Sequence, residues 1–237
     1  MNNTLCLIPA KGCSTRLPGK NLLPLGGKPL IARTIQKALN SNCFKTVCVS
    51  TEDEEVADVA RNHGAEVPFL RPENLSHDPA TIVDVMLHAI EYYKSNGEVY
   101  EKLCVLLPTT PFVTIDDILT AMDLLENCDE SVLLSVTNTE FPPYNSWLVE
   151  EESGHSILAP CFPDSPYAYT KSTECPQTYR SNGAVIIVSV DEFYKNMGYK
   201  GMNKVPYVMP MNRSLDIDTK EDYLYAEFLH KSGLYIE

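Results

Sequence analysis

The chain has 237 residues and a net charge of −13, and its charges are unevenly distributed. The first acidic residue is Glu52, whereas the residues before it carry seven Lys and Arg. An acidic protein is a poor non-specific binder of nucleic acid, because that affinity depends on neutralising phosphates. A basic segment in an acidic chain indicates instead a local site for a small anion.

Length and composition predict one folded domain, with at most a small appendage. The content of 44% hydrophobic and 22% charged residues is typical of globular proteins. No apolar run approaches the roughly 20 residues of a membrane span, and the beginning of the chain lacks the pattern of a signal peptide. The eight cysteines form no Cys-x-x-Cys pair, which favours buried thiols in a reducing compartment. We therefore expect a cytoplasmic protein with no membrane partner.

Strand-like and helix-like segments alternate over the first part of the chain. The expected strands are 4–8, 46–50, 66–70, 102–107 and 131–137. Between them we expect helices that begin at Pro29, after a cap at Thr51, at Thr81 and after a capping box at Thr114. This order predicts an α/β fold with a doubly wound, mostly parallel sheet, whose ligands bind at the carboxyl ends of the strands.

The alternation stops at residue 138. Residues 138–179 contain six prolines and the only tryptophan, and they are too many for a bare loop in a compact domain. We expect an inserted subdomain here, which covers the site or meets a second subunit. The core is then 1–137 and 180–237, and its last part contains expected strands at 183–189 and 207–209 and helices at 191–197 and 219–231.

The most specific motif directly follows the first strand, as Ile8-Pro-Ala-Lys-Gly-Cys-Ser-Thr-Arg-Leu-Pro-Gly-Lys-Asn21. Its two glycines permit close backbone approach, and Lys11, Arg16 and Lys20 supply positive charge, a combination that suits a triphosphate. The spacing is neither that of a P-loop nor that of a G-x-G-x-x-G fingerprint. An ordinary basic surface loop is the alternative.

A second candidate lies near the end of the chain, in Asp216-Ile217-Asp218. In an extended segment, residues i and i+2 point to the same side, so both carboxylates can bind one hard cation while Ile217 enters the core. A solvated turn is the alternative for this frequent pattern.

Three further segments are candidates for ligand contacts. Pro108 to Pro111 follows a strand, Arg71 and Thr81 flank the loop after the expected third strand, and Arg180 to Gly183 opens a core strand. An arginine can bind a carboxylate through two parallel hydrogen bonds, and Lys171 is a second candidate for such a contact. A strand-to-helix turn, a surface cation with a helix cap, and a strand-entry turn are the respective alternatives.

Five blocks in this order resemble the cytidylyltransferases that activate acidic sugars: the acylneuraminate enzymes and their pseudaminate, legionaminate and 3-deoxy-manno-octulosonate relatives. Besides the loop they are Arg71-Pro-Glu-Asn-Leu-Ser-His-Asp78, Leu106-Leu-Pro-Thr-Thr-Pro111, Gln177-Thr-Tyr-Arg-Ser-Asn-Gly-Ala184 and Ser214-Leu-Asp-Ile-Asp-Thr-Lys-Glu-Asp222. The resemblance implies a nucleotide-diphospho-sugar transferase fold, Rossmann-like, and transfer of CMP from CTP to the sugar's anomeric hydroxyl. It also implies Mg²⁺ and a homodimer in which the insert contributes to the partner's site.

Mapped onto these blocks, the resemblance assigns each part of the site. Nucleotide contacts are expected from Pro9, Ala10, Lys11, Gly12, Arg16, Lys20, Asn21, Arg71, Thr81, Leu107, Pro108 and Thr109. Sugar contacts are expected from Thr110, Lys171, Gln177, Arg180 and Asn182. Lys20, Arg16 and Asp218, the last as a candidate base, are the expected catalytic residues, and Asp216 with Asp218 the metal ligands.

Some positions depart from the acylneuraminate pattern. Lys11 replaces a common arginine, Arg16 stands where a glycine is frequent, and Leu107 stands where a glutamine is usual. The segment 14–20 is closer to the 3-deoxy-manno-octulosonate branch, which therefore stays open as the alternative. A metal-dependent glycosyltransferase that uses nucleotide-sugars is the rival enzyme, and a non-enzymatic nucleotide-binding module is the rival of another class.

Overall fold

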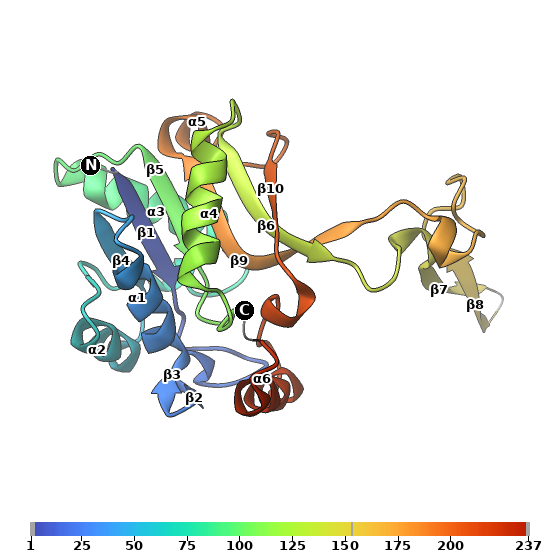
Figure 1. The fold of residues 1–237 in the computed structure, drawn as a ribbon, viewed down its shortest axis with the longest axis horizontal. Helices are drawn as coiled ribbons and strands as arrows, with labels where there is room; N and C mark the ends of the chain where they lie inside the picture. The colour runs from blue at the N-terminus through green and yellow to red at the C-terminus, as the bar shows by residue number, and fades with distance from the viewer. Residues whose placement is uncertain (1–2, 153, 236–237) are drawn as a thin grey trace. The chain divides into compact units, whose positions relative to one another are not determined.

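The structure is a computed structural model that describes residues 3–152 and 154–235. A six-stranded sheet in the order β10-β6-β9-β5-β1-β4 forms its centre (Figure 1). The strands are β1 (Thr4–Pro9), β4 (Thr46–Ser50), β5 (Lys102–Leu106), β6 (Val132–Asn138), β9 (Tyr179–Ser189) and β10 (Val205–Val208). β1 runs parallel to β4 and β5, β10 runs parallel to β6, and β9 runs antiparallel to β5. The expected α/β fold with a mostly parallel sheet is confirmed.

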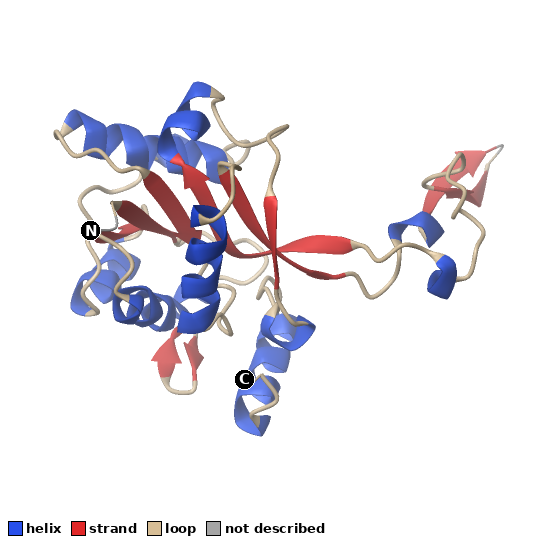
Figure 2. Cartoon of the chain, turned by 45° about the horizontal axis from the view of Figure 1, so that its top comes forward, coloured by secondary structure: helices blue, strands red, loops and turns tan. Residues whose placement is uncertain are grey.

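Helices cover both faces of this sheet, as Figure 2 shows. Those on the two faces are α1 (Leu30–Ser41), α2 (Glu54–Asn62), α3 (Ile82–Ser95), α4 (Ile115–Glu126) and α5 (Val190–Lys195). The last helix, α6 (Lys220–Ser232), packs instead with Leu25, Leu30 and Phe112. Short 3₁₀ turns lie at η1 (Lys20–Leu22), η2 (Glu73–Leu75) and η5 (Met211–Arg213), and a small hairpin joins β2 (Pro24–Leu25) to β3 (Lys28–Pro29). None of the described helices is long and apolar enough to cross a membrane.

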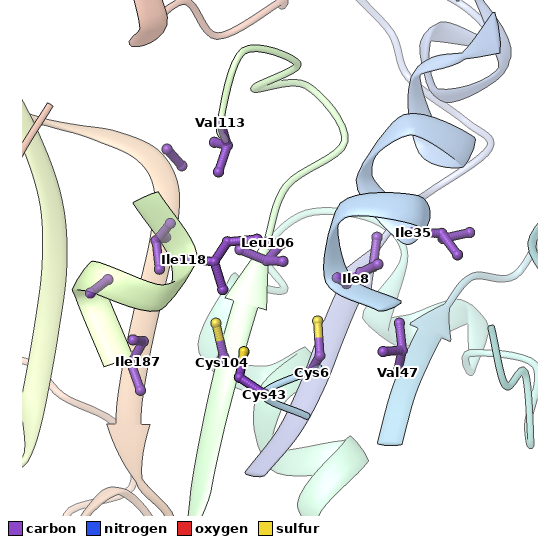
Figure 3. Close-up of a cluster of buried hydrophobic side chains, with 14 of the residues drawn as sticks. Cys6, Ile8, Ile35, Cys43, Val47, Cys104, Leu106, Val113, Ile118 and Ile187 are labelled. Atoms are coloured by element: carbon purple, nitrogen blue, oxygen red, sulfur yellow. The ribbon is translucent and has the colours of Figure 1, made fainter. Parts of the chain in front are cut away.

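The two faces of the sheet take alternate residues of the same strand. In β1, Cys6 and Ile8 pack with buried residues of α1, α2 and α4 (Figure 3). Leu5 and Leu7 belong to a second cluster, with buried residues of α3 and α5. Successive side chains of a strand point to opposite faces, so a strand covered on both faces is apolar throughout. Because the strands hold one another in place, the loops that leave their carboxyl ends are positioned together.

Residues Thr137–Ser181 form a compact unit of their own, distinct from Met1–Val136 with Asn182–Glu237. This second unit contains η3 (Pro143–Asn145), η4 (Ser172–Glu174) and an antiparallel hairpin of β7 (Trp147–Glu152) and β8 (His155–Pro160). The hairpin pairs Trp147 with Pro160 and Val149 with Leu158. Paired residues share a face of the hairpin, so these four residues form an apolar surface, which we call the apolar face, and Trp147, Val149 and Leu158 on it are exposed. The polar pair Glu151 and Ser156 lies next to it on the same side.

Three local expectations were wrong. The expected strand 66–70 is a single parallel bridge between Glu66 and Cys48, because Pro68 offers no N–H to continue the ladder. The cap of α2 is Asp53, whose carboxylate accepts hydrogen bonds from Glu55 and Val56 N–H, rather than Thr51. Pro29 is the residue before helix α1 rather than its first helical residue.

Candidate functional site

The loop after β1 is fixed at both of its ends. At its beginning, Ala10 N–H donates to Ser50 O of β4 over 2.9 Å. At its end, the buried Asn21 donates from its side-chain amide to Lys11 O over 2.8 Å. Gly19 has a left-handed backbone (φ 65) directly before η1, a conformation that glycine adopts without strain. The loop therefore returns on itself, so that the backbone of Lys11 lies beside Asn21 at its other end.

Two of the loop's basic residues converge on Asp218. Lys20 Nζ lies 2.9 Å from Oδ1 and Arg16 Nη2 lies 2.8 Å from Oδ2. Lys20 also donates to Ile217 O over 3.2 Å. The Lys20 side chain is 14% exposed and that of Arg16 65%, so Lys20 holds the Asp218 segment from inside while Arg16 reaches it from solvent.

The segment of the paired carboxylates is held by its backbone and by Ile217. Ile217 N–H donates to Thr109 O over 2.8 Å, and its side chain is fully buried in a cluster with Leu25, Leu30 and Phe112. Asp216 and Asp218 flank this buried residue. Ile217 enters the core between the two carboxylates, as the sequence predicts.

Asp216 is partly buried. Its Oδ1 is buried and has no hydrogen-bond partner. Burial, with a smaller contribution from the charge of Asp218, raises the pKa of Asp216, and a hydrogen bond with the Thr109 side chain opposes that rise. A buried carboxylate oxygen without a partner is an available ligand for a cation.

Leu107 and Asp216 both lie next to Gly183. A Cβ placed on Gly183 would lie 3.0 Å from Leu107 Cδ1 and 4.0 Å from Asp216 Oδ2. The positive φ of Gly183 (+68) is a second reason for glycine at this position. The turn after β5, the beginning of the core part of β9 and the carboxylate pair are thus neighbours.

A buried polar network centred on Asn182 links β6, β9 and the segment before Asp216. Asn182 Oδ1 accepts from Ser135 Oγ over 2.6 Å, and Asn182 Nδ2 donates to Ser214 Oγ over 2.8 Å. Its amide is also engaged by Ala184 N–H and by Met209 Sδ. The side-chain amide of Asn182 makes its bonds inside the protein and the residue is 2% exposed, so through Ser214 it braces the irregular segment that leads to Asp216.

A second network fixes η5, the 3₁₀ turn that precedes this segment. The buried Asp117 of α4 accepts from Tyr207 Oη over 2.6 Å and from Arg213 Nη2 over 2.8 Å. Burial would raise the pKa of Asp117, but these bonds and those of the Thr114 cap outweigh it and hold the pKa below the ordinary value. Asp117, which completes the capping box predicted at Thr114, is thus also the counter-ion of Arg213.

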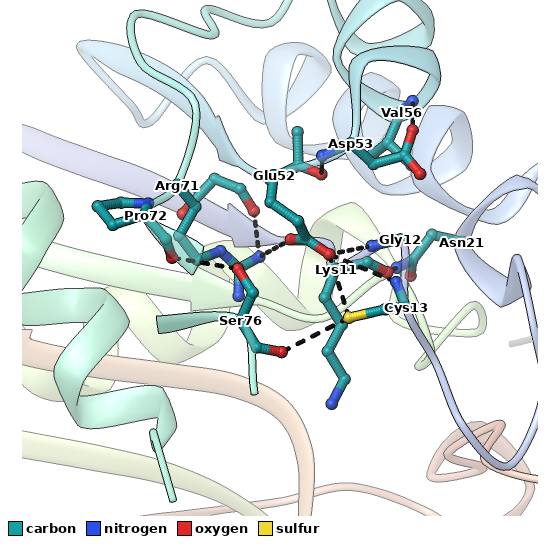
Figure 4. A network of polar contacts seen from close by, with 12 residues as sticks. Lys11, Gly12, Cys13, Asn21, Glu52, Asp53, Val56, Arg71, Pro72 and Ser76 are labelled. Carbon is teal, nitrogen blue, oxygen red and sulfur yellow. Dashed lines mark hydrogen bonds and ion pairs between the residues drawn. The ribbon is translucent and has the colours of Figure 1, made fainter. Parts of the chain in front are cut away.

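Glu52 and Arg71 lie beside the beginning of the loop, near Gly12 and Cys13 (Figure 4). Glu52 Oε1 accepts from Gly12 N–H over 2.8 Å and from Cys13 N–H over 3.4 Å. Arg71 is 6% exposed, donates to Ser50 O over 2.6 Å and lies 3.9 Å from Glu52 Oε2. Sequence reasoning missed Glu52 as a partner of the loop, although it is the first acidic residue and follows a strand that neighbours β1.

Cys13 lies on the same network. Its thiol is 3.4 Å from Glu52 Oε1 and 3.7 Å from His77 Nδ1, so the structure brings a histidine near it that the sequence did not indicate. Burial and the hydrogen bond to Glu52 raise the pKa of Cys13. A protonated thiol is a poor nucleophile, which argues against covalent chemistry here. All eight cysteines are free.

The remaining predicted residues have local roles. Thr81 caps α3 through a capping box with Asp84. Pro108 to Thr110 form the turn after β5, where Thr110 N–H and its hydroxyl both donate to Leu107 O. Lys171, Gln177 and Arg180 belong to the second unit.

The donor set fits a hard divalent cation. Asp216 and Asp218 offer carboxylate oxygens, the ligands that Mg²⁺ prefers, and Mg²⁺ characteristically binds through one or two carboxylates together with substrate phosphates. In residues 3–152 and 154–235 no cluster of three or more His, Cys, Asp or Glu side chains could hold a metal by itself. Two carboxylates beside a basic loop are therefore suited to a metal that arrives with a phosphate ligand.

Comparisons with known proteins find relatives over nearly the whole chain. A family model described as cytidylyltransferase matches residues 5–236. A pseudaminic acid cytidylyltransferase of Campylobacter jejuni is 33% identical over 228 residues, which are 96% of each protein. A CMP-N,N'-diacetyllegionaminic acid synthase of Legionella pneumophila is 31% identical and covers 95% of each. An N-acylneuraminate cytidylyltransferase of Escherichia coli is 32% identical over 94% of this chain and 51% of that protein.

Among solved structures, a CMP:2-keto-3-deoxy-manno-octonic acid synthetase complexed with CTP superposes with a TM-score of 0.72. It covers 97% of this chain and 99% of that chain at 17% identity. A 4-diphosphocytidyl-2C-methyl-D-erythritol synthase from Anaerococcus prevotii gives a TM-score of 0.64 at 9% identity. These likenesses show a shared fold.

Proposed function

The chain belongs to the cytidylyltransferase family, and from this premise we propose that it transfers CMP from CTP to the anomeric hydroxyl of an acidic 3-deoxy-2-keto sugar, releasing pyrophosphate. The relatives named for pseudaminic, legionaminic and N-acylneuraminic acids support a nine-carbon sugar of this class. The 3-deoxy-manno-octulosonate reaction is the second candidate, favoured by the loop segment 14–20.

One observation carries the proposal: Arg16 and Lys20 of the loop both form ion pairs with Asp218. A loop that gathers cations at a carboxylate pair can hold a triphosphate and its metal together. Phosphoryl transfer depends mostly on positioning and on stabilising charge, and both are available from this arrangement.

We assign the nucleotide to the loop side of the site. Lys11, Arg16 and Lys20 neutralise the triphosphate and the departing pyrophosphate, Asn21 holds the loop closed, and Arg71 serves the cytidine half. Pro9, Ala10, Thr81 and the turn Leu107 to Thr109 complete this half. The sugar hydroxyl attacks the α-phosphorus in line, the bond to the β-phosphate oxygen breaks, and Asp218 is the candidate acceptor of the hydroxyl proton.

Asp216 and Asp218 are the proposed ligands of Mg²⁺. The buried Asp216 oxygen without a partner supports this assignment. When bound, Mg²⁺ supplies positive charge at the α-phosphate and the leaving pyrophosphate. For the sugar we propose Thr110, Lys171, Gln177 and Arg180, of which the two cations suit the sugar carboxylate. Asn182 is proposed to act on the sugar only through the segment that it braces at Ser214.

The second unit is proposed to form a homodimer with a second copy of the chain, and residues 138–179 to be its dimerisation segment. An isolated two-stranded hairpin is marginally stable in water, and the apolar face of β7–β8 lies exposed. Burial of this face by the same face of another copy would remove both liabilities. We further propose that the enzyme works in the cytoplasm, where CTP is available.

The decisive experiment measures pyrophosphate release from CTP and Mg²⁺ with a panel of acidic 3-deoxy-2-keto sugars. We expect release that requires one nine-carbon member of the panel. Release that occurs only with the eight-carbon sugar would select the second candidate. Release that depends on none of these sugars would exclude both.

A further inference from the structure

The carboxylate of Glu52 occupies backbone donors at the beginning of the phosphate loop. It accepts from Gly12 N–H over 2.8 Å and from Cys13 N–H over 3.4 Å (Figure 4). Successive backbone N–H groups in a tight loop form a site for an anion. In this protein the anion is supplied by the chain itself, so these two N–H groups are already used.

Glu52 keeps its charge in this position. Its side chain is 20% exposed. Burial by itself would raise the pKa of Glu52, but the backbone hydrogen bonds and Arg71 outweigh burial and lower it. The loop donors therefore face a carboxylate that is ionised at neutral pH.

The same carboxylate faces Arg71 on its other side. Arg71 Nη2 lies 3.9 Å from Glu52 Oε2 and donates to Ser50 O over 2.6 Å. Arg71 Nε is buried without a hydrogen-bond partner, so this guanidinium has a donor that the described residues do not use. The backbone of Arg71 is tied to the same strand end, because its N–H donates to Thr51 O over 2.8 Å.

Close packing makes the contact between Glu52 and the loop rigid. A Cβ on Gly12 would lie 2.2 Å from Asp53 Oδ2, so only glycine lets the loop backbone approach the segment 52–53 this closely. The loop and the turn after β4 are thus packed directly against each other, and the Glu52 carboxylate links them by hydrogen bonds.

We infer that Glu52 is a positioning residue that sets the phosphate loop and Arg71 in a fixed relation, so that it controls the affinity for CTP but not for the sugar. This inference rests on the proposed function, since CTP is the ligand whose two halves the loop and Arg71 would hold. It follows that Gly12 and Cys13 N–H groups hold Glu52, and that the backbone donors left for the triphosphate belong to the later part of the loop, from Ser14 to Lys20, while the side chains of Lys11, Arg16 and Lys20 supply the positive charge.

The test is the variant Glu52→Gln, which keeps the shape of the side chain and removes its charge. Because a charged acceptor binds N–H groups more strongly than a neutral one, we expect the KM for CTP to rise about tenfold or more. The KM for the sugar and kcat at saturating CTP should stay within about twofold of the wild type. Calorimetric titration with CTP in the absence of sugar should show the same loss of affinity.

Asp53→Asn is the matched control. Asp53 neighbours the same loop, but its carboxylate accepts from Glu55 and Val56 N–H rather than from the loop. This variant should bind CTP as the wild type does. If Glu52→Gln does not fold, Glu52→Asp, which keeps the charge and shortens the reach, is measured in the same way with the same selective loss expected.

A variant at Glu52 that binds CTP like the wild type, or that changes the two KM values and kcat equally, overturns the inference. The proposed function is tested separately by the wild-type enzyme. If none of the acidic sugars makes the wild type release pyrophosphate, the proposed function is wrong. The CTP titration still tests the role of Glu52 in that case.

Discussion

Lys20 Nζ lies 2.9 Å from Oδ1 of Asp218, although 198 residues separate the two in the chain. The other carboxylate oxygen is taken by Arg16. The proposed metal ligand is therefore neutralised by the cations that we assign to the triphosphate. Binding of metal-bound CTP would exchange these partners, because the cations turn to the phosphates and Asp218 is released to the metal.

This exchange predicts opposite effects of Arg16→Ala on two ligands. CTP affinity should fall by about tenfold, because a phosphate partner is lost. The affinity of the free enzyme for Mn²⁺, used as a probe by electron paramagnetic resonance, should rise, because Asp218 loses a competing cation. The control Arg61→Ala removes an exposed ion-paired cation of α2 and should change neither. A fall in both affinities would contradict the exchange.

Removal of either carboxylate should stop turnover without unfolding the protein. Asp216→Asn and Asp218→Asn are expected to lower kcat by at least about 100-fold, since both oxygen ligands serve one metal. Asp216 Oδ1 has no hydrogen-bond partner, so the melting temperature of Asp216→Asn should not fall. Pyrophosphate release and thermal denaturation measure the two effects, and wild-type rates in either variant would remove the metal assignment.

Asp117 should contribute a pH-dependent share of stability. Its pKa is lowered in the folded state, so the contribution is present above the unfolded pKa near 3.8 and is lost as pH falls through the lower folded pKa. Asp117→Asn should cost about 3 kcal/mol of unfolding free energy at pH 7, because it breaks a buried ion pair. Urea denaturation should show this difference shrinking below about pH 4.

Asp116→Asn is the control for that series, because Asp116 is exposed on the same turn of α4. It should be nearly neutral at every pH. A difference between wild type and Asp117→Asn that does not vary with pH would show that the charge of Asp117 is not responsible.

Gly183→Ala should destabilise the protein and disturb the packing of Leu107 near Asp216. The positive φ alone costs an alanine about 1–2 kcal/mol. The new Cβ would also press on Leu107, which neighbours Asp216 through the same glycine. Gly27→Ala has a similar φ of +79 and nothing within 4 Å, so it isolates the backbone cost. We expect Gly183→Ala to lose more stability in denaturation than Gly27→Ala, by the cost of the contact with Leu107, and only Gly183→Ala to lower kcat/KM.

The apolar face of the β7–β8 hairpin should hold two copies together. Val149→Lys places a charge at a position that is 70% exposed in the single chain. Sedimentation should show a dimer for the wild type and a monomer for the variant, with circular dichroism unchanged. Glu150→Lys, on the opposite face of the same strand, is the control and should stay dimeric. A monomeric wild type would exclude the dimer.

Local sequence patterns were sufficient for much of the fold. The apolar runs at β1, β4 and β5 predict strands because both of their faces are buried, and the cap at Thr114 predicts α4 because its pattern is local. The segment 66–70 failed because an apolar run does not reveal whether a partner strand has free N–H and C=O groups beside it. Proline at position 68 decided that question against a strand.

The sequence by itself determined the family, the basic loop and the carboxylate pair with Ile217 between them, because each is a short motif whose chemistry depends on neighbouring residues. Only the tertiary structure decided which distant side chains meet. Three contacts join segments far apart in the chain: the hydrogen bond of Asn182 to Ser214, that of Gly12 N–H to Glu52, and the ion pair of Lys20 with Asp218. Parallel strands bring their carboxyl ends to one edge of the sheet, and no local pattern records which partners are found there.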